Sequence, residues 1–104
     1  MANKITTKAI NSFLRGENFH LNNTCVLNDG TTTKLLLWGN CIAYYNNNER
    51  EIYFSLCGWN TKTTRERLNG LGLCIRTRAG VVYWGKHEID AYKYHNSEIK
   101  AYNF

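Results

Sequence analysis

The chain has 104 residues, of which 43% are hydrophobic and 20% charged, and its formal net charge is +5. This size and composition predict one folded domain over residues 1–104 and exclude an intrinsically disordered chain. No apolar run approaches the roughly 18–20 residues of a membrane span, and the first residues lack the apolar centre of a secretory signal. We therefore expect a cytoplasmic protein.

The first predicted element is a short helix over residues 6–15. Apolar side chains at positions 10, 13 and 14 are three and four residues apart, which places them on one helix face. Thr6 or Thr7 is the expected N-cap, and Gly16 stands where a helix usually ends.

Antiparallel strands are expected next, separated by polar turns. Asp29-Gly30 and Gly39-Asn40 are typical hairpin turns, because Gly, Asn and Asp accept the positive φ angles that tight turns require. The four strands that result cover residues 19–27, 31–38, 41–46 and 51–57.

A second short helix is expected to begin near Thr63. Thr63 and Glu66 fit a capping box, in which each side chain bonds a free backbone N–H of the first turn, and Asn60 or Thr61 is an alternative cap.

This helix is too short to be stable alone, so it must dock on the sheet. Leu68 and Leu71, together with Trp59, are the expected docking residues, and Gly70 or Gly72 is expected to end the helix in a left-handed turn.

Residues 73–86 predict a last hairpin that turns at Ala79-Gly80, and the tail from His87 either adds an edge strand or lies along the surface. The fold class is therefore α+β. We expect an antiparallel meander of about six strands with a short N-terminal helix and a short helix inserted after the fourth strand.

The four cysteines contain no C-x-x-C pair, although their spacing of 16 or 17 residues could bring cysteines of neighbouring strands together. Zinc sites usually draw ligands from local pairs, so no metal site and no cofactor is predicted. In a reducing cytosol we expect thiols that pack as small buried apolar residues.

Nearly all of the excess positive charge lies in residues 58–86, which hold six basic residues and one acidic residue. A like-charged cluster repels itself, so it indicates either an anionic partner or a solvated basic face.

The start of the second helix is the first candidate for such a partner. Helix N-termini attract phosphate and carboxylate groups through free N–H groups and the helix dipole. Alternatively, the threonines only cap the helix and the arginines are solvated. The candidate anion-binding residues are Lys62, Thr63, Thr64, Arg65 and Arg67.

The last hairpin is the second candidate. Arg76 and Arg78 are two positions apart on a strand, so they share a face, and Tyr83 and Trp84 lie on the partner strand. Arginine beside aromatic rings is typical of surfaces that bind single-stranded nucleic acid, and also of any half-solvated sheet. Trp59 and Trp84 are the candidate stacking or packing residues.

Two segments, WGNCIAYY (from Trp38) and GWNTKTTRERLNGLG (from Gly58), resemble a set of small phage-encoded proteins. The shared pattern is a Gly-Asn turn followed by Ile-Ala, and then Gly-Trp-x-Thr-x-Thr-Thr-x-x-Arg-Leu-Asn. The resemblance covers about a third of the chain and implies a small accessory protein that acts inside an infected bacterium. It carries no catalytic residue with it.

We therefore hypothesise a non-enzymatic phage accessory protein that binds nucleic acid, or a host machine that processes it, through residues 58–86. An alternative is a protein inhibitor of a host defence enzyme, whose interface would use Trp38, Tyr44, Tyr45 and Tyr53. A weaker alternative is a small metal-independent ribonuclease. The histidines that could serve it are His20, His87 and His95, with Glu88 beside His87 and the two hairpin arginines for the phosphate. The chain could also dimerise through an edge strand.

Overall fold

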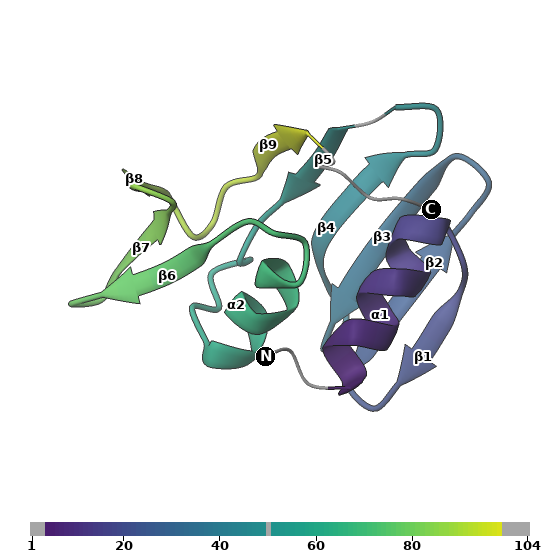
Figure 1. The fold of residues 1–104 in the computed structure, drawn as a ribbon, viewed down its shortest axis with the longest axis horizontal. Helices are drawn as coiled ribbons and strands as arrows, with labels where there is room; N and C mark the ends of the chain where they lie inside the picture. The colour runs from purple at the N-terminus through teal and green to yellow at the C-terminus, as the bar shows by residue number, and fades with distance from the viewer. Residues whose placement is uncertain (1–3, 50, 99–104) are drawn as a thin grey trace.

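The computed structural model describes residues 4–49 and 51–98, which form two helices and nine strands in two antiparallel sheets (Figure 1). The large sheet has the strand order β1-β2-β3-β4-β5-β9 and the small sheet has the order β6-β7-β8. The elements are α1 (Lys4–Arg15), β1 (Phe19–Leu21), β2 (Thr24–Asn28), β3 (Thr32–Leu37), β4 (Asn40–Asn46), β5 (Glu51–Phe54), α2 (Lys62–Asn69), β6 (Ile75–Arg78), β7 (Val81–Trp84), β8 (His87–Glu88) and β9 (His95–Glu98).

The α+β class and both helices are confirmed, including the insertion of α2 after the meander. The tail contributes strands to both sheets, because β8 pairs with β7 and β9 returns to pair with β5. Of the tail, residues 99–104 lie outside the described residues.

Helix α1 lies across one face of the large sheet and buries Ala9, Ile10 and Phe13 (Figure 1). Gly16 follows it at φ 68°, as expected for a helix end. The expected N-cap at Thr6 or Thr7 is wrong, since both residues lie inside the helix. Thr6 is fully buried and belongs to the contact between the two helices.

The expected single strand over residues 19–27 is wrong, because a turn at Asn22 (φ 54°) divides it into β1 and β2. After this turn Thr24 and Val26 are buried, whereas Leu27 faces solvent and is 49% exposed. Asparagine accepts the left-handed conformation that the turn needs. The turn was not predicted because the apolar alternation of residues 19–27 continues through it.

The hairpin turn at Asp29-Gly30 is fixed by its aspartate. The Asp29 carboxylate accepts hydrogen bonds from the backbone N–H groups of Thr31 and Thr32, each at 2.9 Å. These bonds hold the pKa of Asp29 below its usual value, because they favour the charged carboxylate.

The next turn forms one residue earlier than expected, at Trp38 (φ 53°) and Gly39 (φ 80°), and Asn40 begins β4. This shift places Trp38 at the tip of the hairpin. The turn at Ala79-Gly80 is as expected, with both residues at positive φ.

Helix α2 is capped by Thr61, whose side chain accepts from the Thr64 N–H at 3.2 Å, and the expected capping box at Thr63 and Glu66 does not form. Gly72 adopts the left-handed conformation (φ 81°), whereas Gly70 stays right-handed. A Cβ on Gly70 would lie 2.8 Å from Ile10 Cγ1, so Gly70 lets the two helices approach each other.

Leu68 and Leu71 are buried and dock α2 in the common core, as expected. Trp59 does not join them, since it is 60% exposed. Trp84 packs edge-on against Phe54 with ring centroids 4.9 Å apart, which ties the small sheet to the large one.

Candidate functional site

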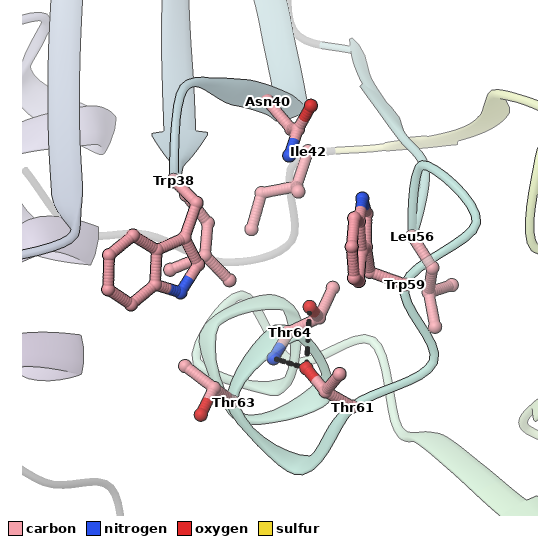
Figure 2. A pocket seen from close by; sticks show the side chains of 9 residues that line it. Trp38, Asn40, Ile42, Leu56, Trp59, Thr61, Thr63 and Thr64 are labelled. Carbon is pink, nitrogen blue, oxygen red and sulfur yellow. Dashed lines mark hydrogen bonds between the residues drawn. The ribbon is translucent and has the colours of Figure 1, made fainter.

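A pocket of about 530 Å³ opens between the β3–β4 turn and the start of α2. Figure 2 shows the indoles of Trp38 and Trp59 on opposite sides, with Ile42 and Asn40 above and the cap Thr61 and the α2 residues Thr63 and Thr64 below. The lining residues are Leu37, Trp38, Asn40, Ile42, Leu56, Trp59, Thr61, Thr63 and Thr64. None of these residues carries a charge.

The two tryptophans are unusual because they project into solvent, at 75% exposure for Trp38 and 60% for Trp59. Their backbones are nevertheless fixed. The Trp38 N–H donates to the Asn23 carbonyl at 2.8 Å, and the Trp59 N–H donates to the Leu56 carbonyl at 2.8 Å. A tryptophan that serves only to pack the core is buried. Two indoles that stay exposed on hydrogen-bonded backbone are typical of a binding surface.

The floor of the pocket is apolar and belongs to the protein core. Leu37, Ile42 and Leu56 are at most 3% exposed. Thr64 is also buried, and its hydroxyl lies 3.0 Å from that of Thr61 (Figure 2). A ligand would therefore meet an apolar base with hydroxyl and amide groups at its edge.

Lys62 and Thr63 begin α2 at the edge of this pocket. Lys62 is exposed and Thr63 is partly buried, while Thr61 caps the helix. The Arg65 N–H already donates to the Thr61 carbonyl at 3.1 Å. The expected threonine capping is thus confirmed for Thr61, and the expected anion site at this helix start stays a prediction.

Arg65 is held in place by Asn60. Its guanidinium Nη1 donates to the Asn60 Oδ1 at 2.5 Å and to the Asn60 carbonyl at 3.2 Å. Asn60 Nδ2 in turn donates to the Thr77 hydroxyl of β6 at 3.1 Å. These bonds position a cation beside the start of α2 and link it to the small sheet.

Arg67 does not belong to this surface, because it is only 2% exposed. Its guanidinium donates to Thr24 at 3.1 Å, to Thr6 at 2.5 Å and to the Glu66 carboxylate at 3.0 Å. A guanidinium enclosed in this way cannot reach a phosphate. The inclusion of Arg67 among the candidate anion-binding residues is therefore corrected, and its role is to join α1, α2 and β2.

Arg76 and Arg78 share a face of β6, as expected, and both are exposed. The Arg76 guanidinium lies over the Tyr83 ring, 5.6 Å from its centroid. Trp84 follows Tyr83 in β7 and points to the other side, where it packs on Phe54. Of its two expected roles, Trp84 therefore has the packing role.

The possible ribonuclease set does not assemble on one face. In β8, His87 pairs with Trp84 and Glu88 pairs with Tyr83, so the two side chains point to opposite sides of the small sheet.

Among residues 4–49 and 51–98, no three His, Cys, Asp or Glu side chains gather in a way that could hold a metal ion.

A second aromatic cluster lies on the face of the large sheet away from α1. Tyr44 stacks on Tyr53 at 5.1 Å and meets Tyr94 edge-on at 5.5 Å. Tyr94 donates to the Cys41 carbonyl at 2.5 Å, and burial raises the pKa of both the Tyr94 phenol and the Cys41 thiol. Both groups are therefore neutral near pH 7, and the Cys41 thiol is a poor nucleophile.

The cysteines differ from the expected buried residues. All four are unpaired thiols, but Cys74 is exposed and the other three are only partly buried.

Tyr45, which was expected to serve in a protein interface, is buried and donates to the Phe13 carbonyl at 2.5 Å, so it cannot serve there.

A family model described as "Kyanoviridae Gp96 protein" matches residues 2–102 of the chain. The chain belongs to this family. The expected membership of a small phage-encoded family is thereby confirmed, and the match extends over both ends that the sequence resemblance did not cover. Neither the comparison with curated proteins nor that with solved structures gives a match. Within the described part of this Gp96-family chain, no helix is long and apolar enough to cross a membrane.

Sequence reasoning named Trp38 only for a protein–protein interface and left it out of the candidate nucleic-acid site. The residue was visible in the Trp-Gly-Asn turn, but a turn placed at Gly39-Asn40 left Trp38 at the end of a strand. A tryptophan followed by glycine at a hairpin tip is the signal that could have identified it.

Proposed function

We propose that this Gp96-family protein is a non-enzymatic phage accessory protein that binds nucleic acid through residues 58–86, in the cytoplasm of the infected host. One observation carries the proposal. The single carboxylate of this segment, Glu66, is used internally by the buried Arg67 at 3.0 Å. The other five basic side chains of the segment are at least partly exposed: Lys62, Arg65, Arg76, Arg78 and Lys86.

Four of these cations occupy two places. Lys62 and Arg65 lie at the start of α2, beside the pocket. Arg76 lies over Tyr83 on the small sheet, and Arg78 follows it on the same face of β6. Cations that form no ion pair within residues 4–49 and 51–98, near rings that are at least partly exposed, suit the two components of a nucleic acid. The cations bind phosphate and the rings stack on bases. A flexible anionic polymer can contact both places, whereas a compact anion would reach only one.

The experiment is a salt titration of binding to a labelled single-stranded oligonucleotide, measured by fluorescence anisotropy. The slope of log affinity against log salt should be about −0.7 per phosphate contact, which gives about −3.5 if all five cations take part. Replacing Lys62, Arg76 and Arg78 by glutamine should make the slope shallower by about 2.

The matched control replaces three exposed cations of α1, Lys4, Lys8 and Arg15, by glutamine. It removes the same charge from another surface and should change the slope by less than about 1, because distant charges act only through the screened field. An equal effect of both triple variants, or no binding at low salt, would contradict the proposal.

A second candidate function is inhibition of a host enzyme through protein contacts. The specific observation that favours it is the tyrosine cluster opposite α1, where the stacked Tyr44 and Tyr53 are partly exposed and Tyr94 is 45% exposed. Aromatic residues are enriched at protein interfaces. A pulldown from host lysate, with and without nuclease, separates the two functions. Captured material that nuclease removes supports nucleic-acid binding, and a stoichiometric protein that survives nuclease supports inhibition.

A further inference from the structure

We propose that the pocket between Trp38 and Trp59 accepts an unpaired base of single-stranded nucleic acid, while the adjacent cations bind the flanking phosphates. This inference rests on the proposed function and specifies it. It names the chemical class of the ligand as a single strand with accessible bases, and it adds Trp38, outside residues 58–86, to the binding site.

The first argument is the geometry of the two indoles. They lie on opposite sides of the pocket and come from two separately anchored segments (Figure 2). Each remains mostly exposed, so each has an aromatic face free to stack. Figure 2 shows the Trp38 ring face-on and the Trp59 ring nearly edge-on, so a planar base in the pocket can stack on one indole and contact the other at an angle. Stacking on an aromatic ring tolerates any base.

The second argument is the shape and polarity of the pocket. Its volume of about 530 Å³ lies within the ~300–1,000 Å³ that is usual for small-ligand sites. Its floor is apolar, whereas Asn40, Thr61 and Thr63 place amide and hydroxyl groups in the wall. A nucleobase has the same division, with apolar faces and polar edges.

The third argument is the distribution of charge, which selects among possible occupants. The lining residues carry no charge, yet Lys62 stands between two of them in the chain, and Arg65 is fixed nearby by Asn60. A neutral pocket with cations at its edge complements a neutral base joined to charged phosphates. An uncharged apolar peptide would have no anionic group for these cations to bind. A base within a duplex is already stacked and paired, so the pocket favours single strands.

The experiment compares the binding of three labelled oligonucleotides of equal length and charge per strand: oligo(dT), the same strand with abasic sites throughout, and the oligo(dT)·oligo(dA) duplex. The wild-type protein should bind oligo(dT) at least roughly ten-fold more tightly than the abasic strand, because stacking is lost. The intrinsic tryptophan fluorescence should be quenched by oligo(dT) and not by the abasic strand.

The variants Trp38→Ala and Trp59→Ala should each weaken oligo(dT) binding roughly ten-fold and leave binding of the abasic strand unchanged. Trp59→Phe keeps an aromatic face and should restore part of the loss. Leu27→Ala is the matched control, because it removes an apolar side chain that is 49% exposed and outside the pocket. Circular dichroism of each variant tests that it is folded.

The outcomes separate the inference from the proposed function. Equal, salt-dependent binding of oligo(dT) and the abasic strand would overturn base insertion and leave charge-driven binding intact. No binding of any oligonucleotide at low salt would overturn both. Loss of a nuclease-resistant host protein from pulldowns with Trp38→Ala, with oligonucleotide binding unchanged, would assign the pocket to a protein and overturn the inference.

Discussion

Helix α2 contributes to two regions of opposite character. Towards α1 it forms a buried polar cluster in which the Arg67 guanidinium joins Glu66, Thr6 and Thr24. Towards the β3–β4 turn it forms the pocket, where Thr61, Thr63 and Thr64 face two exposed tryptophans. In the described residues every buried side-chain polar atom has a hydrogen-bond partner.

The difference shows that one short helix contributes to a buried polar cluster on one side and to an exposed pocket on the other, for which we propose a recognition role. In the buried cluster the polar groups satisfy one another, so removing the Arg67 guanidinium removes several hydrogen bonds and one ion pair at once. In the pocket the two indoles are mostly exposed, so we expect that removing either costs the fold little and removes part of the proposed binding surface. Residues of α2 that look alike in the sequence, such as Arg65 and Arg67, therefore have different roles.

The largest expected effect is that of Arg67→Ala, which should lower the free energy of unfolding by about 3 kcal/mol. The substitution leaves the Glu66 carboxylate without its cation and the hydroxyls of Thr6 and Thr24 without this donor. Urea unfolding followed by circular dichroism measures the loss.

Arg65→Ala is the matched comparison, since Arg65 is only partly buried and bonds mainly to Asn60. Its expected loss is about 1 kcal/mol or less. Equal losses for the two variants would show that the buried cluster is not the stabilising region.

A smaller effect is expected for Gly70→Ala, at about 1–3 kcal/mol. The backbone angles of Gly70 suit alanine, so the loss would come from packing alone. The new Cβ would lie 2.8 Å from Ile10 Cγ1 and 2.9 Å from Thr6 Cγ2, forcing α1 and α2 apart. Thermal unfolding measures the change. An increase in stability, as helix propensity alone would give, would contradict the close contact of the two helices.

The smallest effect on stability is expected for the pocket tryptophans. Trp38→Ala and Trp59→Ala should each change the free energy of unfolding by less than about 1 kcal/mol, because both indoles are mostly exposed. Trp84→Ala is the contrasting variant and should cost more, about 2–3 kcal/mol, since its ring packs against Phe54. If Trp59→Ala and Trp84→Ala lowered the free energy of unfolding equally, Trp59 would contribute to the core. That result would contradict the distinction between the buried cluster and the exposed pocket.

The sequence determined the fold class and most of the elements. Apolar spacing located α1, and glycine-containing turns located most hairpins, because helical period and turn chemistry are local properties. The placement of Leu68 and Leu71 in the core followed from the same pattern. Two errors in strand boundaries, at Asn22 and Trp38, come from non-glycine residues in left-handed turns, which local patterns rarely indicate. The expected strand over residues 51–57 also ends early, at Phe54.

Only the tertiary structure decided which side chains share a surface. Arg67 meets Thr24 and Thr6 across more than forty positions of the chain, and no local pattern shows such a contact. Trp38 and Trp59 likewise come from separate turns and meet at one pocket, while Trp84 turns inward. The sequence thus determined how much charge and aromatic surface the protein has. Packing between distant segments decided which of it is buried and which is exposed, because burial depends on contacts that form only when the chain has folded.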